Sequence, residues 1–341
     1  QYLSLKQWHF VGTPMEQDAS ITTEPYTNSN GKWNANCYTY NEAYDISPDP
    51  ANSDAGNFPS DVWVYAHNGG GYGEPATSWD AMQPATGYIV WDEGNKTVDF
   101  SGSALNAGAV TANLGYTFND ANSGAFDGWN LIANPYPSYY DADQLTFSGD
   151  VYKCVYIYNG DNYEYILPTG GSTDGHSVTL GQISSRYIPP AQGFFVKAHG
   201  TGASVGFSDA GRAHSSEPLY KHPTAGLPPQ TAVLELHTDS LSDPTMVRWA
   251  QAATPAFDGD WDAFKFYSFR EDMPQLYSLA GGVSFAINSL PPGGQPLSLG
   301  IKTPQGGPCQ IVLANSTFPD TVPLFLEDKQ TGTTHRLAPG R

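Results

Sequence analysis

The chain has 341 residues, of which 14% are charged and 13% are aromatic, and its 34 acidic against 15 basic residues give a formal net charge of −19. A protein of this charge repels polyanions, which excludes nucleic acid and anionic membrane surfaces as partners. The aromatic residues, with 36 glycines and 27 prolines, favour short strands joined by tight turns, and the length predicts two or three domains.

Two segments of the chain carry three similar landmarks in the same order. The first segment has WHFVGTP (8–14), CYTYNEA (37–43) and MQPATGYIV (82–90), and the second has WNLIANP (129–135), VYIYNGD (155–161) and IPPAQGFFV (188–196). The first segment is longer because it carries Gly-, Pro- and Asp-rich insertions of loop composition. The pattern predicts an internal duplication of β-sandwich domains, jelly-roll or immunoglobulin-like, over residues 1–112 and 113–214.

The pattern changes after the second copy. Residues 215–230 form a Pro-rich segment without periodicity, which predicts a linker. Beyond it, short apolar runs recur about every ten residues, as in a β-sandwich. They predict seven strands, at 231–239, 245–252, 263–269, 282–288, 297–302, 309–315 and 323–329. We therefore expect an all-β protein whose third sandwich spans 231–341, with one more strand needed to close it.

Several of these segments resemble a known family. GWNLIANPYPS (128–138), IPPAQGFFVKA (188–198) and ATPAFDGDWDAFKFYS (253–268) are similar to a recurrent β-sandwich region of large secreted Bacteroidota proteins. That region usually lies upstream of the sorting domain used by the type IX secretion system, and no sorting domain is recognisable here. The resemblance implies export and an extracellular or cell-surface location. No apolar run is long enough to span a membrane.

The three cysteines, Cys37, Cys154 and Cys309, share no close spacing. This arrangement favours neither a zinc site nor a disulfide framework. We expect three isolated core cysteines, and one bridged pair with a free thiol is the alternative.

Alternating carboxylates predict a candidate calcium site at Asp258, Asp260 and Asp262. Calcium binds six to eight oxygen ligands, and clustered carboxylates supply several of them. The segment lacks the glycine and the bidentate glutamate of an EF-hand loop, so a solvated turn is the alternative. A second acidic stretch, with Glu42, Asp45, Asp49 and Asp54, offers the same two interpretations. No cofactor is required by any motif.

Aromatic side chains in predicted loops are candidates for stacking on sugar rings. Rigid amphipathic rings provide contact area at low entropic cost. The alternative is that these rings fill the core and the domain interfaces. The candidates are Trp63, Tyr72, Trp79, Tyr136, Tyr139 and Tyr140.

Short motifs in the chain resemble a catalytic turn and glycosylation sites. The sequence GASVG (202–206) matches the nucleophile elbow of hydrolases, but Ser204 leads directly into a predicted strand and not into the helix which that chemistry needs. Asp-Ser-Leu at Ser240 and Asp-Thr-Val at Thr321 resemble the sequence at which Bacteroidota O-glycosylate exported proteins.

These observations predict a non-catalytic, extracellular structural or adhesive protein exported as type IX cargo. One alternative is a carbohydrate-binding module of a larger secreted enzyme. The other is a subunit of a surface fibre that is assembled by strand donation, since unpaired sheet edges recruit strands from neighbours. The expected partners are therefore glycans or other copies of the chain, besides the export machinery.

Overall fold

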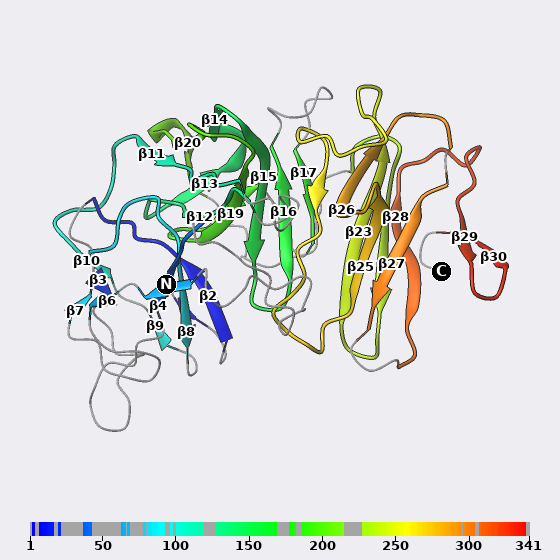
Figure 1. The fold of residues 1–341 in the computed structure, drawn as a ribbon, viewed down its shortest axis with the longest axis horizontal. Coiled ribbons are helices and arrows are strands. Elements are labelled where there is room, and N and C mark those ends of the chain that lie inside the picture. Colours follow the sequence, from blue (N-terminus) through cyan, green and yellow to red (C-terminus); the bar gives the residue numbers. More distant parts are fainter. Residues whose placement is uncertain are drawn as a thin grey trace. The chain divides into compact units, whose positions relative to one another are not determined.

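The computed structural model of the chain is all-β, which confirms the predicted fold class (Figure 1). The residues that the structure describes are 2–3, 7–16, 20–21, 37–42, 63–65, 67–68, 78–79, 81–92, 96–97, 100–118, 127–168, 177–181, 186–214, 227–294, 296–303 and 307–338. In that part of the chain the only helical elements are the short 3-10 turns Ala142–Gln144 and Asp209–Gly211. No described helix is long and apolar enough to cross a membrane.

The chain divides into two compact units. Unit 1 contains Gln1–Gly160 and Arg186–Leu219, and unit 2 contains Asp161–Ser185 and Tyr220–Arg341. The predicted boundary at 112/113 falls inside unit 1, and most of the predicted linker lies outside the described residues. The division into three domains stays a prediction.

Two sheets of unit 1 repeat one strand order. The first runs β2 (Gln7–Val11), β8 (Tyr88–Asp92), β4 (Cys37–Tyr40) and β5 (Trp63–Tyr65). The second runs β12 (Trp129–Ala133), β19 (Gly193–Ala198) and β15 (Val151–Tyr158). The three sequence landmarks of each copy therefore lie on strands in corresponding places, which supports the duplication.

The two copies also contact each other reciprocally. Val11 at the end of β2 bridges to Gln192, and Ile132 near the end of β12 bridges to Thr86. The amide of Gly12 donates to the Ala191 carbonyl at 2.8 Å, and the amide of Gly87 donates to the Leu131 carbonyl at 3.1 Å. Each copy thus uses the end of its first strand to hold the turn within the third landmark of the other copy.

Shorter strands complete unit 1. Three of the small sheets have two strands each: β1 (Tyr2–Leu3) with β9 (Lys96–Thr97), β3 (Ser20–Ile21) with β10 (Phe100–Ser101), and β6 (His67–Asn68) with β7 (Ser78–Trp79). In a three-stranded sheet, β20 (Ser204–Phe207) lies between β11 (Val110–Asn113) and β14 (Thr146–Ser148). In another, β13 (Tyr139–Asp141) lies between β18 (Tyr187–Ile188) and β21 (Arg212–Ala213).

Unit 2 is built on one large sheet. Its strands run in the order β27 (Ser298–Lys302), β25 (Gln275–Ala280), β26 (Val283–Leu290), β23 (Ser242–Trp249), β22 (Thr231–His237) and β28 (Gln310–Ser316), with β24 (Ala263–Phe264) also paired to β26. β23 and β26 pair in parallel, and the other pairs are antiparallel. Two hairpins belong to the same unit, β16 (Tyr163–Leu167) with β17 (Val178–Leu180), and β29 (Phe325–Asp328) with β30 (Thr333–Arg336).

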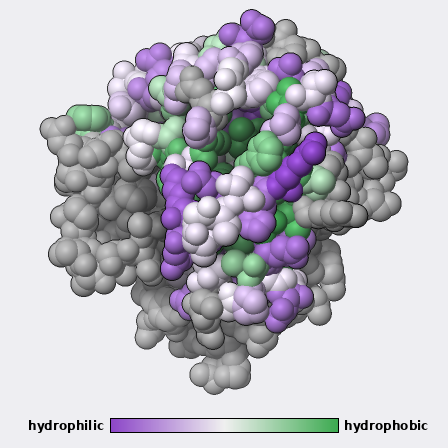
Figure 2. Space-filling view, turned by 90° about the vertical axis from the view of Figure 1, so that its right-hand side faces the viewer, coloured by the Kyte–Doolittle hydropathy of each residue, from purple (hydrophilic) through white to green (hydrophobic). Residues whose placement is uncertain are grey.

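The large sheet curls around an apolar cluster. Its centre is Ala232, Leu234, Leu236, Leu276 and Leu313, and Leu299 of edge strand β27 and Ile311 of edge strand β28 pack against it. Both ends of the sheet therefore border the same core. On the side of the molecule that carries β28 to β30, apolar residues lie in a hollow rimmed by polar ones (Figure 2).

All seven strands predicted beyond the linker exist, but the expectation for this region was incomplete. Strands β25 and β30 were not predicted, and only Ala263–Phe264 of the predicted strand 263–269 is extended and paired. The cysteine prediction needs one correction. All three thiols are free and Cys37 and Cys154 are buried, but Cys309 is exposed because it precedes the edge strand β28.

Candidate functional site

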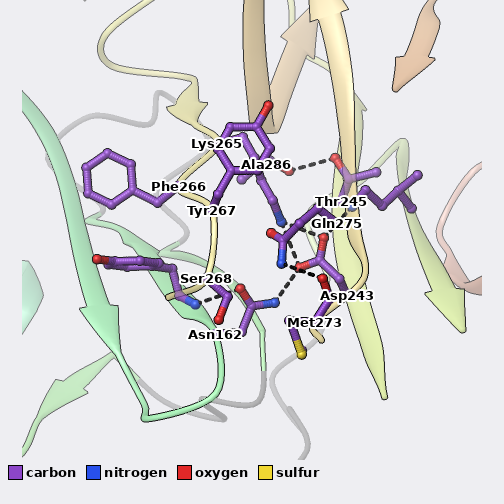
Figure 3. Close-up of polar contacts among 12 residues, drawn as sticks. Asn162, Asp243, Thr245, Lys265, Phe266, Tyr267, Ser268, Met273, Gln275 and Ala286 are labelled. Carbon is purple, nitrogen blue, oxygen red and sulfur yellow. Dashed lines mark hydrogen bonds and ion pairs between the residues drawn. The ribbon is translucent and has the colours of Figure 1, made fainter. Parts of the chain in front are cut away.

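A buried ion pair lies in unit 2, where Asp243 of β23 faces Lys265, the residue directly after β24 (Figure 3). The Lys265 Nζ lies 2.7 Å from Asp243 Oδ1 and 2.6 Å from Oδ2, and each side chain is only 1% exposed. Inward and outward residues alternate along the start of β23, with Asp243 and Thr245 inward. The strand register thus delivers a carboxylate to the interior.

Further donors surround the same carboxylate. The Asn162 Nδ2 donates to Asp243 Oδ1, and the backbone amide of Leu276 donates to Oδ2. Asn162 is held in turn by the Tyr163 amide, which donates to its Oδ1 at 2.9 Å. Gln275 and Met273 border the group from the segment at the start of β25 (Figure 3). Residues far apart in sequence therefore converge on one carboxylate.

The electrostatics of this cluster follow from its burial. Burial lowers the pKa of the Lys265 ammonium, and the adjacent Asp243 opposes that shift. Removing one partner of such a pair leaves an uncompensated buried charge, which costs far more than an exposed pair contributes. The cluster can hold these strands in register, and it places an amine within hydrogen-bonding distance of a carboxyl group.

A second polar group surrounds Asp262, which the sequence analysis assigned to calcium. Its Oδ1 accepts the Ser289 amide at 2.6 Å and its Oδ2 accepts the Asp258 amide at 2.8 Å. The Arg248 guanidinium lies 5.1 Å from the Trp261 ring centroid and donates through Nε to Ser289 Oγ. Burial raises the pKa of Asp262 to about 7.

The side chains of the other two residues of the candidate calcium site, Asp258 and Asp260, have different surroundings. Asp258 accepts hydrogen bonds from the amide and the hydroxyl of Thr254, and Asp260 is exposed. Among the residues that the structure describes, no group of three or more His, Cys, Asp or Glu residues could hold a metal ion. Asp258 and Asp262 hold the backbone of their own loop, and the calcium site stays a prediction.

In the second acidic stretch, only Glu42 is described. Its carboxylate accepts the Gly128 amide at 3.0 Å and the Thr117 hydroxyl at 3.1 Å, so it bridges the two copies within unit 1. Asp45, Asp49 and Asp54 lie outside the described residues.

The aromatic candidates are distributed between core and surface. Tyr136 and Tyr140 stack with their centroids 5.7 Å apart, and both are 0% exposed. They fill the core, because each hydroxyl reaches a backbone carbonyl there, that of Gly108 and of Gln144 respectively. Neither ring presents a face to a sugar.

The remaining aromatic candidates are less enclosed. Tyr139, on β13, is half-buried, and Trp63, on β5, is half-buried with its ring against Phe10 and Tyr40. Trp79 lies on β7 and its side chain is not described, while Tyr72 lies outside the described residues. The structure brings no two of these four together among the contacts it describes.

Ser240 and Thr321, the candidate glycosylation residues, are both exposed and lie at turns. Ser204 lies in β20, where it pairs with Asn113 and Ser148 inside a sheet. This is the extended conformation expected for a residue outside a nucleophile elbow.

Asp243, Lys265 and Asn162 were missed by the sequence analysis. One signal was available, since Lys265 interrupts the aromatic run AFKFYSF and a lysine flanked by Phe264 and Phe266 has apolar neighbours on both sides. A buried lysine needs a partner carboxylate, but the sequence does not say which of the 34 acidic residues supplies it.

Comparison with family models gives one match, to a family described as "Domain of unknown function (DUF8693)", over residues 26–340. Comparison with curated proteins and with solved structures finds no match.

Proposed function

Since the chain belongs to the DUF8693 family, whose description assigns no function, we propose its function from its own residues and geometry. The protein is a non-catalytic structural and adhesive component of the bacterial cell surface, exported by the type IX secretion system. The export route and location derive from the resemblance of residues 128–138, 188–198 and 253–268 to secreted Bacteroidota proteins.

The observation that carries this proposal is that charged and aromatic side chains of the chain are buried and contact one another or the backbone in the interior. Asp243 and Lys265 are buried against each other, and Tyr136 and Tyr140 are buried against backbone carbonyls. Side chains buried in this way help to specify the fold and do not contact a substrate. A surface protein that must survive outside the cell benefits from this arrangement.

Surface display is the first test. Antibody against the protein, applied to intact cells of the source organism, should label the cell surface, and deletion of a core component of the secretion system should leave the protein inside the cell. The deletion strain should also adhere less well to host or biofilm surfaces. Turnover of a polysaccharide or peptide by the purified protein would overturn the non-catalytic proposal.

Assembly of a surface fibre by strand donation is the second candidate, and a specific observation favours it. Within the described residues, β27 and β28 each have a partner strand on one side only. Ile301 of β27 is 51% exposed and Phe325 of β29 is 59% exposed. An unpaired edge beside exposed apolar side chains is suited to accept a strand from another chain.

Electron microscopy and light scattering of the native protein test the fibre. Filaments that disappear on Ile301→Lys, with Thr303→Lys as a control just beyond the same strand, would support strand addition at β27. A monomer at all concentrations would contradict it. The carbohydrate-binding alternative depends on Trp63 and Tyr139, and a glycan array with Tyr139→Ala tests it.

A further inference from the structure

The Asp243–Lys265 pair is a close, bidentate ion pair, and the inference from its geometry does not depend on the proposed function. Lys265 Nζ is within 2.7 Å of both oxygens of one carboxylate, and those oxygens are the only hydrogen-bond acceptors that the structure gives it. An atom so placed lies about 3 Å from the carbon that the oxygens share, which is a near-attack separation. The nucleophile is thus already beside the carbonyl carbon.

The surroundings favour the uncharged form of Lys265. Each side chain of the pair is 1% exposed, and burial lowers the pKa of the Lys265 ammonium. Transfer of one proton from the ammonium to the carboxylate gives a free amine beside a carboxylic acid. A neutral amine is the nucleophilic form of lysine.

Two donors are in place to stabilise the charge that would develop on oxygen. The Asn162 Nδ2 and the Leu276 amide each donate to a different oxygen of Asp243. Donors aimed at a developing oxyanion in a site without water are among the strongest contributions to acyl transfer. The cluster therefore contains a nucleophile, an acyl carbon and an oxyanion site.

We propose that Lys265 and Asp243 condense to form an intramolecular amide crosslink. Nζ attacks Cγ, the Nζ–Cγ bond forms and one Cγ–Oδ bond breaks, and the departing oxygen leaves as water with two of the three ammonium protons. No oxidant, reductant or cofactor is needed. In a dry site the held pair reacts at an effective molarity of roughly 10⁵–10⁸ M, which favours the amide over its hydrolysis.

The crosslink has a defined place in the sheet. Ile287 of β26 pairs with Met246 of β23 and with Ala263 of β24, so these two strands flank β26. A bond from Asp243 of β23 to Lys265, directly after β24, would join two of the neighbours of β26 across it. It would brace the sheet against forces that separate these strands.

Peptide mapping of the full-length wild-type protein by mass spectrometry decides the question without any variant. The expected result is a single crosslinked peptide containing Asp243 and Lys265, lighter than the sum of its parts by one water. Recovery of both peptides unmodified would overturn the proposal. Loss of ammonia with Lys265 joined to Asn162 would overturn the assignment to Asp243.

Variants exclude other sources of mass loss. Water can also be lost by cyclisation at the three Asp-Gly sequences, Asp127-Gly128, Asp174-Gly175 and Asp258-Gly259, and ammonia can be lost at Gln1, but none of these changes involves Lys265. Lys265→Arg should restore the mass of one water, and Lys302→Arg, at an exposed lysine, should not. If Lys265→Arg proves insoluble, Asp243→Asn serves in its place, because any link it forms must release ammonia instead of water.

Discussion

Ala85 and Ala191 adopt the same left-handed backbone conformation, with φ of 59° and 53°, at corresponding positions of the two copies in unit 1. Each follows a proline, and each turn closes with a 3.2 Å hydrogen bond, from Thr86 N to Gln83 O and from Gln192 N to Pro189 O. Positive φ at the third residue of a four-residue turn, directly after a proline at the second, defines a type II turn, where glycine is the usual choice at the third position. Both copies place alanine at the turn position where glycine is usual, which is expected if one copy was derived from the other.

The same correspondence predicts that the glycine after each turn cannot carry a side chain. A Cβ at Gly193 would lie 2.9 Å from Phe10 Cβ, and one at Gly87 would lie 2.5 Å from Leu131 Cγ. We expect Gly193→Ala to lower the free energy of unfolding by about 1–3 kcal/mol, because a well-packed core must shift to admit it. Urea denaturation measures this change.

Gly108→Ala is the matched control, since nothing lies within 4 Å of its added Cβ. It should change the free energy of unfolding by no more than about 0.5 kcal/mol. Equal effects of the two substitutions would contradict the close contact between the copies.

Breaking the buried pair should be costly. Lys265→Met leaves Asp243 charged and uncompensated, which predicts a loss of about 3–5 kcal/mol in the free energy of unfolding. The double variant Lys265→Met with Asp243→Leu removes both charges and should recover much of that loss. Thermal and urea unfolding of both variants test this. If the double variant is as unstable as the single one, the uncompensated charge is not the cause.

The titration of Asp262 should make stability depend on pH in the direction opposite to that of most carboxylates. Its pKa is raised from 3.8 unfolded to about 7 folded, so the folded state binds the proton more tightly. This contribution is fully present below pH 4 and is lost as the pH rises to 7, with a slope of at most about 1.4 kcal/mol per pH unit.

Asp262→Asn removes the titration, so the difference in free energy of unfolding between the wild type and this variant should fall as the pH rises from 4 to 8. Asp260→Asn, at an exposed position of the same loop, is the control. Urea unfolding of the three proteins across this pH range provides the measurement. Parallel profiles for Asp262→Asn and the wild type would contradict the assignment.

The thiols should react at very different rates. Cys309 is exposed, whereas Cys37 and Cys154 are buried and burial raises the pKa of Cys37 to about 12. Since the thiolate is the reactive form, Ellman's reagent should modify one thiol quickly in the folded protein and three after denaturation. Cys309→Ser should abolish the fast phase, and a surviving fast phase would show that a buried thiol is accessible.

Tyr140 should matter for stability and not for glycan binding. Its hydroxyl accepts the Ser208 amide at 3.0 Å and donates to the Gln144 carbonyl at 3.1 Å. Tyr140→Phe leaves buried partners unsatisfied and should cost about 1–3 kcal/mol. Tyr139→Phe, on the half-buried neighbour, is the control for denaturation and glycan-array measurements. Loss of glycan binding on Tyr140→Phe, with the fold intact, would contradict its place in the core.

The strands that follow apolar periodicity were predictable, and the exceptions have physical causes. In β25, Gln275 and Ser278 are buried, so polar residues lie where a sequence pattern requires apolar ones. In β30 all four residues are exposed, so there is no apolar signal to detect. Asp243 precedes Pro244 and looks like part of a turn, although it lies in a strand. Its partners Lys265 and Asn162 come close only through the tertiary fold.

Unit 2 is made from two separate stretches of chain, and this limits how it can be excised. The fragment 231–341 lacks Asn162, which donates to Asp243, and Tyr165, whose hydroxyl contacts the backbone of Phe266. Truncation at the predicted linker would therefore yield a fragment whose core lacks the Tyr165 ring and whose buried Asp243 carboxylate lacks one of its hydrogen-bond donors. Recombination in evolution meets the same obstacle, because no single cut in the gene separates this unit from the rest. A gene fragment that is to encode unit 2 must therefore keep residues 161–185 together with residues 220–341.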